Sequence, residues 1–436
     1  MRRGDVLEQR REIVQYQKIW NWAIFIVFSA FCGGGIGVIT ALFLQMLRLV
    51  MSVLWSETLQ AAFSFLIGGI RINLYVILIC ILGGVLIGFW QHKYGDYPKS
   101  LEELLVVYKT NKNIPYNNLG IVAVAAFLPL AFGGSVGPEA GLAGILMMLF
   151  CWLRDKYKSA ITEILKHNDC EKRTFLYDLL LVRPRTMLGF DLQYEDKVYT
   201  ISKAQKIVIY LSASAGGVLC FWLMGELFKQ SGMEFVRFNE ITYTLYELIA
   251  FIPIVILGIL VGMVFILVQE IVKRVFQPIE HKKILRAVVA GFLLGGFGMF
   301  LPYTMFSGEE QMVDLVNHLD SWSVSMLLAT GLVKMLIINI CIFGGWKGGN
   351  FFPSLFCSAA LGFALASFLP VDSSFVVVIF MAAYCSSALG VAPVVAVLMM
   401  LFAPASALLA VFAASFIGGF VNKRVKTAVL QYKSYA

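Results

Sequence analysis

Long uncharged apolar segments dominate the pattern of hydrophobic and polar positions. No charged residue occurs from Asn21 to Leu47 or from Ile72 to Trp90, and Asp372 is the only charge from Gly348 to Asn422. A helix that spans a bilayer needs roughly 20 apolar residues. The pattern therefore predicts an all-α polytopic membrane protein. Because each span must satisfy its backbone polar groups inside the bundle, we expect a single transmembrane domain over residues 20–430.

Several of these apolar segments are too long for one span and too short for two, and glycine pairs or prolines interrupt them. Irregular backbone at membrane depth is tolerated where it is buried in protein or lines a cavity. Broken helices at corresponding places of two halves indicate a transporter's binding site. The corresponding stretches here are GGSVGP (133–138) and GGNFFP (348–353). We expect two repeats, at about 20–230 and 245–430.

The charged residues lie mainly between these segments. Basic residues gather in the N-terminal arm (1–19), in 271–286 and after residue 422, whereas 307–322 contains four acids and no lysine or arginine. Lysine and arginine favour the cytoplasmic side of a membrane. This distribution predicts a multi-pass protein of the cell membrane with both termini in the cytoplasm.

Two further segments are polar. Residues 154–204 form a polar insertion in the first repeat, which we interpret as a cytoplasmic connector or, alternatively, as a regulatory or docking element. Residues 431–436 form a short C-terminal tail.

Composition and charge exclude several classes of function. Hydrophobic residues make up 59% of the chain and charged residues 14%, far from the values of soluble domains. The net charge of +8 is split among short segments, so the sequence predicts no nucleic-acid binding. The eight cysteines show no CxxC pairing or metal-ligand spacing with histidine. We therefore expect no metal site, no disulfide framework and no cofactor. No nucleophile–base pair or phosphate-binding loop indicates an enzyme.

The two glycine stretches have the composition of an anion site. A helix N-terminus offers unpaired N–H groups and a partial positive charge, which bind anions. Glycine allows close approach of the backbone, and proline in the first helical turn loses no hydrogen bond. Ordinary helix kinks would give the same spacing, so both interpretations stay open at this point.

Longer motifs resemble those of the CLC family of chloride channels and proton-coupled chloride antiporters. The first repeat matches this family in patches and the second repeat matches it well. The motifs that resemble the family are GSVGPEAG (134–141), LPYTMFSGEEQM (301–312), GGNFFPSLFCSAALG (348–362), SSALGVAPVVAVLMM (386–400) and KRVKTAVL (423–430).

The resemblance implies two inverted repeats with broken, re-entrant helices, and a homodimer with one pore per subunit. Its partners would be the lipid bilayer and an inorganic anion, with chloride as the default. Seven residues of the two glycine stretches would offer backbone N–H groups to that anion. They are Ser135, Val136, Gly137, Gly349, Asn350, Phe351 and Phe352.

Departures from the family pattern concern the gate. Val136 occupies the place of the family's gating glutamate, and a valine can neither compete with an anion nor bind a proton. Glu139, one helical turn later, is either a displaced gate or an acid that complements its own helix dipole. Lys426 stands where the family has a pore tyrosine. Lys347 attracts anions or is a snorkelling interface residue.

Two other positions bear on the pore. The family's Gly-Ser-Gly-Ile-Pro motif is absent, and Asp96 of the nearest stretch, YGDYP (94–98), would repel an anion if it faced the pore. Lys334 lies inside an apolar segment, where we expect it to snorkel or to pair with an acid.

The function that follows is passive, channel-like conduction of an anion, because the gating glutamate is replaced by Val136. One alternative is a proton-coupled anion antiporter whose proton path has moved to Glu139. A second alternative is a CLC-derived scaffold or sensor that does not conduct.

Overall fold

The computed structural model describes residues 3–67, 70–99, 101–111, 113–166, 203–228 and 236–435. Most of the insertion predicted at 154–204 lies outside the described residues, as does the side chain of Lys426. The chain divides into two compact units. Unit 1 comprises Met1–Arg48, Leu104–Gly120 and Ile145–Gly232, and unit 2 comprises Leu49–Glu103, Ile121–Gly144 and Met233–Ala436.

Helices account for nearly all of the described secondary structure, as predicted. In the first half they are α1 (Arg3–Leu54), α2 (Glu57–Ala62), α3 (Leu74–Tyr94), α4 (Leu101–Asn111), α5 (Leu119–Ala131), α6 (Glu139–Lys166) and α9 (Lys203–Leu227). In the second half they are α10 (Leu245–Phe276), α11 (Lys283–Phe300), α12 (Glu309–Asn317), α13 (Val324–Phe343), α14 (Phe351–Ala366), α15 (Ser373–Leu389), α16 (Ala392–Met399) and α17 (Leu408–Tyr435).

Short elements complete the fold. Strands β1 (Ser64–Ile67) and β2 (Ile70–Asn73) form an antiparallel hairpin in which Ser64 pairs with Asn73. The 3-10 turns in the described part of the chain are η1 (Gln277–Ile279), η2 (Pro302–Thr304), η3 (Leu319–Ser321) and η4 (Ala405–Ala407). The hairpin is a small addition to the all-α architecture that the sequence predicts.

Helix lengths agree with a membrane protein that has broken helices. Among the described residues, seven helices are long and apolar enough to cross a membrane. Three other apolar helices, α5, α14 and α15, have 13, 16 and 17 residues and fall short of a full span. Short helices of this kind are expected where a chain enters the membrane and turns back.

Helix boundaries follow local signals that are visible in the sequence. The hydroxyl of Thr244 accepts from the N–H of Tyr246 and, together with Glu247, forms a capping box at the start of α10. Asp372 Oδ1 accepts from the N–H of Phe375 at 2.9 Å at the start of α15. Gly390 ends α15 in the left-handed conformation, which glycine adopts without strain.

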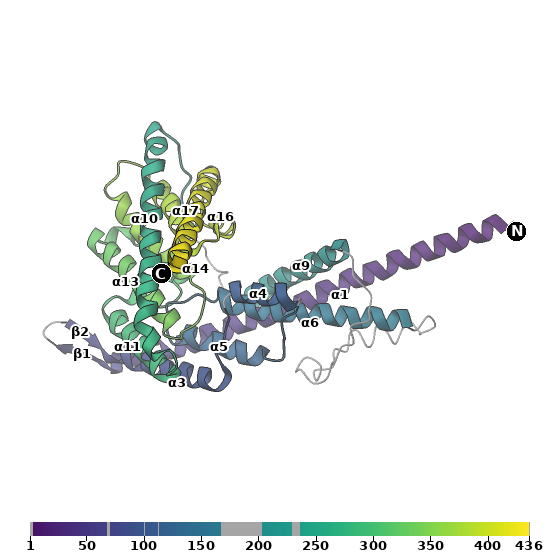
Figure 1. The fold of residues 1–436 in the computed structure, drawn as a ribbon, viewed down its shortest axis with the longest axis horizontal. Coiled ribbons are helices and arrows are strands. Elements are labelled where there is room, and N and C mark those ends of the chain that lie inside the picture. The colour runs from purple at the N-terminus through teal and green to yellow at the C-terminus, as the bar shows by residue number, and fades with distance from the viewer. Residues whose placement is uncertain are drawn as a thin grey trace. The chain divides into compact units, whose positions relative to one another are not determined.

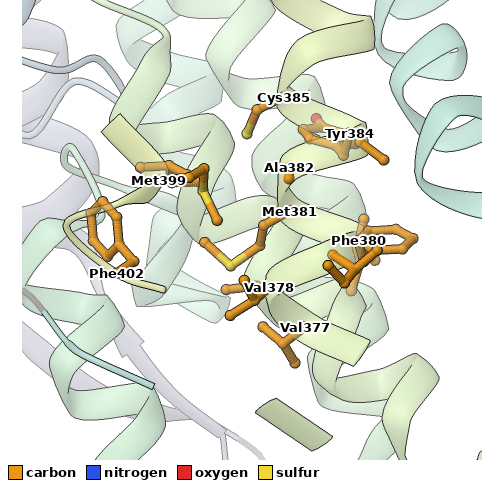
Figure 2. Close-up of a cluster of buried hydrophobic side chains, with 14 of the residues drawn as sticks. Val377, Val378, Phe380, Met381, Ala382, Tyr384, Cys385, Met399 and Phe402 are labelled. Atoms are coloured by element: carbon orange, nitrogen blue, oxygen red, sulfur yellow. The ribbon is translucent and has the colours of Figure 1, made fainter. Parts of the chain in front are cut away.

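The core of unit 2 surrounds α15. All residues from Ser374 to Ala388 are buried. The helices that pack against α15 are α10, α14, α16 and α17, which are labelled in Figure 1. Figure 2 shows side chains of α15, among them Val378 and Met381, in one cluster with Met399 at the end of α16 and Phe402 just after it. Because every residue from Ser374 to Ala388 is buried, α15 lies inside the bundle of unit 2.

A second contact in unit 2 joins α3 and α11, which lie side by side (Figure 1). Small residues allow their backbones to approach closely. A methyl group added to Gly84 would lie 2.5 Å from the carbonyl oxygen of Ala287. This packing fixes the C-terminal end of α3 beside the N-terminal end of α11.

Candidate anion site

The two glycine stretches meet in unit 2, although more than 200 residues separate them in the sequence. Gly137 and Gly349 form an antiparallel bridge, in which Gly137 N–H donates to Gly349 at 2.7 Å and Gly349 N–H donates to Gly137 at 2.8 Å. Each stretch is followed directly by a helix: α6 begins at Glu139 and α14 begins at Phe351. The bridge therefore places the starts of two helices beside each other.

The bridge uses the N–H groups of two of the seven residues that were predicted to bind the anion. The N–H groups of Gly137 and Gly349 bond to each other, so in this conformation they are not available to a shared anion. The N–H groups of Phe351 and Phe352, at the start of α14, have a different partner, the side chain of Glu139.

The carboxylate of Glu139 lies on the N-terminus of α14. Its Oε1 accepts from the N–H of Phe351 at 2.8 Å, and the N–H groups of Phe352 and of Glu139 itself also bond to it. Glu139 lies in the first turn of α6, and its side chain at the same time reaches the start of α14. A carboxylate here stands where a free anion would bind.

Two buried hydroxyls flank this arrangement without a partner. Among the described residues, Ser135 Oγ and Ser354 Oγ have no hydrogen-bond partner, and both residues are fully buried. Glu139 Oε2 is likewise buried and without a partner. Buried polar groups are normally paired, so Ser135, Ser354 and Glu139 have hydrogen-bonding capacity left for a polar ligand.

Val136 is completely buried and lies against the second glycine stretch. A methyl group added to Gly348 would lie 2.6 Å from Val136 Cγ2, so the valine side chain packs against the second glycine stretch. It contributes no charge to the site. Its role in the structure is to fill the space between the two loops.

Lys334 on α13 holds the loop that supports the first glycine stretch. Its Nζ donates to the carbonyls of Tyr303 and Met305 at 2.9 Å and of Phe306 at 3.2 Å. Phe306 N–H in turn donates to the carbonyl of Gly133 at 3.0 Å. The side chain is fully buried and forms no ion pair in the described part of the chain, so both expectations for Lys334 were wrong.

Lys347 and Asp96 lie together in a charged cluster next to the second glycine stretch. Lys347 Nζ is 3.9 Å from Asp96 Oδ2, and Lys283 Nζ and Arg286 Nη2 are 3.5 and 3.6 Å from Asp96 Oδ1. The sequence raised the concern that Asp96 would repel an anion. Three cationic side chains surround this carboxylate and offset its negative charge. The sequence offered no sign of this cluster, because its members come from α11 and two separate loops.

A substitution tests how tightly the two stretches fit. A methyl group added to Gly349 would overlap the Glu139 carboxyl group. We expect Gly349→Ala to destabilise the fold by about 2 kcal/mol, as overpacking of a close contact does, and thermal unfolding in detergent measures this. Gly296→Ala is the matched control, because nothing lies within 4 Å of the added methyl group. Equal unfolding midpoints for both variants would show that the Glu139 side chain moves aside without loss of stability.

Relatives by sequence match a small part of the chain. A putative ion-transport protein, YfeO, from Escherichia coli (strain SMS-3-5 / SECEC) is 30% identical over 83 residues, and its counterpart in Escherichia coli (strain K12 / DH10B) is 29% identical over 83 residues. The aligned region covers 19% of this chain and 20% of each relative.

Two solved structures share the fold over almost their whole length. One is a CLC-type fluoride/proton antiporter, with a TM-score of 0.64 and 17% identity over 92% of this chain and 96% of that one. The other is a slow cyanobacterial Cl⁻/H⁺ antiporter, with a TM-score of 0.66 and 16% identity over 94% and 97%. These identities are low, so the similarity shows the fold.

The family itself is shown by a match of more than half of the sequence. The model of the voltage gated chloride channel family covers residues 192–423, which include the second glycine stretch and the helices that enclose it. The expectations of a CLC-like fold and of membership in that family are confirmed. The chain belongs to the voltage gated chloride channel family.

Proposed function

We propose that this protein moves a small inorganic anion, chloride by default, across the cell membrane, and that the anion displaces the carboxylate of Glu139. Family membership supports anion transport. The observation that supports the displacement is the bond of 2.8 Å from Phe351 N–H to Glu139 Oε1. The homodimer and the cytoplasmic position of both termini belong to the same proposal.

The position of Glu139 links anion movement to protons. A carboxylate and an inorganic anion compete for the same N–H groups at the start of α14, because both are attracted by the helix dipole. Two negative charges in one buried site repel each other strongly. The carboxylate leaves this site more easily once it has bound a proton and become neutral. Each anion that enters the site therefore favours protonation of Glu139.

This geometry favours the antiporter alternative over passive conduction. In the antiporter, anions and protons move in opposite directions, and Glu139 alternates between a charged state on α14 and a protonated state away from it. Passive conduction remains the second candidate because of one specific observation. By the family resemblance Val136 stands at the position of the gating glutamate, and this valine is buried and cannot bind a proton.

Flux from proteoliposomes tests the proposal. The purified full chain is reconstituted with chloride inside, a potassium ionophore is added, and chloride release and external pH are followed together. We expect chloride release to drive proton uptake at a fixed ratio. Chloride release without proton movement would support passive conduction instead. If chloride, fluoride and nitrate all stay inside, the proposal of anion transport is wrong, and the scaffold or sensor alternative gains support.

A further inference from the structure

Trp346 is the largest fully buried side chain in the described part of the chain, and it is not one of the predicted anion ligands. It belongs to the loop between α13 and α14, just before the second glycine stretch. A buried tryptophan makes extensive apolar contacts, and its ring N–H needs an acceptor. The contacts of Trp346 therefore show which parts of the molecule its loop is fixed to.

Three glycines from separate parts of unit 2 contact the indole ring, and we call them the indole socket. They are Gly83 of α3, Gly134 of the first glycine stretch and Gly291 of α11. A methyl group added to these residues would lie 2.9 Å from Cη2, 3.0 Å from Cε3 and 3.0 Å from Cζ2 of the tryptophan, respectively. The six-membered part of the ring therefore packs against backbone in all three places, and a side chain there would crowd it.

Hydrogen bonds fix the orientation of Trp346 in this socket. Its Nε1 donates to the carbonyl of Ala287 on α11 at 2.9 Å, and its backbone N–H donates to the carbonyl of Cys341 on α13 at 2.8 Å. Rotation of the ring would break the bond to Ala287 and would leave that buried N–H without an acceptor, which is costly. The ring is therefore held in one orientation against the first glycine stretch.

The two glycine stretches are connected at two points, which differ in kind. Trp346 contacts Gly134, which precedes Gly137 of the bridge by three residues, and this aromatic contact is the first connection. The second is the bridge itself, with its two hydrogen bonds between Gly137 and Gly349. An anion can take over the N–H groups of the bridge, because backbone N–H groups bind anions. It cannot replace a buried apolar contact, because burial of an unpaired charge is unfavourable.

We propose that Trp346 is a positioning residue for anion transport. It holds the two glycine stretches together at Gly134 while the bridge opens for the anion. It then returns them to the separation at which the carboxylate of Glu139 reaches the N–H of Phe351. Trp346 acts through the glycine stretches and binds neither the anion nor the proton. The inference rests on the proposed function for the role of Glu139.

Amide hydrogen exchange of the purified full chain in detergent tests this role without any transport. Trp346→Leu removes the ring, and we expect the N–H groups of Gly137 and Gly349 to exchange at least about tenfold faster, because the bridge opens more often. Trp152→Leu is the matched control, since Trp152 is 6% exposed and belongs to unit 1. It should leave both rates within about twofold of the wild-type rates. Equal rates in Trp346→Leu and the wild-type protein would overturn the proposal.

A conservative variant covers the case in which Trp346→Leu does not fold. Trp346→Phe keeps an aromatic ring in the socket and loses the bond to Ala287. We expect about threefold faster exchange at Gly137 and Gly349 in this variant. Exchange at the wild-type rate would contradict the proposal in the same way.

The ratio of protons to chloride in the flux assay tests the link to Glu139. Unfolded molecules move neither ion, so a substitution that only lowers the amount of folded protein leaves this ratio unchanged. We expect the ratio to fall at least about threefold in Trp346→Leu, because a displaced carboxylate no longer meets α14 correctly. It should stay within about twofold of the wild-type value in Trp346→Phe and in Trp152→Leu. Faster exchange at the bridge with an unchanged ratio would overturn the role of Trp346 in placing Glu139.

The two measurements separate this inference from the proposed function. If the wild-type protein moves chloride without protons, the half-saturating chloride concentration replaces the ratio. A rise of at least about threefold in Trp346→Leu and none in Trp152→Leu then supports the positioning role, and equal values overturn it. If the wild-type protein moves no anion, the proposed function fails, and the exchange rates alone decide whether Trp346 fixes the two glycine stretches.

Discussion

Glu139→Gln is expected to abolish proton movement and to leave chloride movement intact. Glutamine has the shape of glutamate, and its amide oxygen can still accept from Phe351 N–H, but it carries no charge and binds no proton. A hydrogen bond to a neutral oxygen is about half as strong as one to a carboxylate. We therefore expect chloride to displace the amide more easily, and the ratio of protons to chloride to fall at least tenfold, measured by simultaneous chloride and pH recording.

The control for this variant is another acid with the same substitution. Glu310 is exposed in the first turn of α12, so Glu310→Gln should leave the ratio of protons to chloride unchanged. Chloride should also raise the unfolding temperature of Glu139→Gln more than that of the wild-type protein. The reason is that the carboxylate no longer competes for α14, and a ligand that binds the folded state stabilises it. Unchanged proton coupling in Glu139→Gln would mean that Glu139 only stabilises the two helix starts.

The sequence predicted the features that depend on local composition. Apolar segments of about 20 residues indicate spans because of the thickness of a bilayer, and Gly-Pro breaks indicate where helices start. The caps at Thr244 and Asp372, which start α10 and α15, were not predicted and come from the structure. The two glycine stretches, 133–138 and 348–353, were identified by their matching composition and by the family resemblance, and the structure places them in contact.

Contacts between distant parts of the chain could not be predicted from the sequence. Spacing along α6 says which residues neighbour Glu139 on its own helix, and it cannot show that the carboxylate reaches the start of α14. The cluster around Asp96 joins residues more than 180 positions apart, for which no local pattern exists. The predicted role of Lys334 failed for a related reason. The sequence does not show which backbone carbonyl groups lie near a side chain. Three of them accept hydrogen bonds from Lys334 in place of the expected acid.

Lys334→Met is expected to destabilise the protein and to abolish transport. The substitution leaves the carbonyls of Tyr303, Met305 and Phe306 without their donor, at a cost that is partly offset because a buried charge is also removed. We expect a net loss of about 3 kcal/mol. Thermal unfolding in detergent measures the loss, and chloride flux measures its consequence. Lys273→Met, at an exposed position of α10, is the control for removal of one positive charge.

The two measurements together distinguish a structural role of Lys334 from an electrostatic one. The lysine holds the loop whose Phe306 supports Gly133, so a structural role predicts that stability and flux decline together. Methionine keeps the apolar stem and can still contact the ring of Phe356, which lies 4.8 Å from Lys334 Nζ. If the variant unfolds at the wild-type temperature and conducts no chloride, the charge acts on the anion through its field. If both quantities are unchanged, the loop does not depend on Lys334, and the position of the first glycine stretch must be fixed by other contacts, such as that of Trp55 with Ala131.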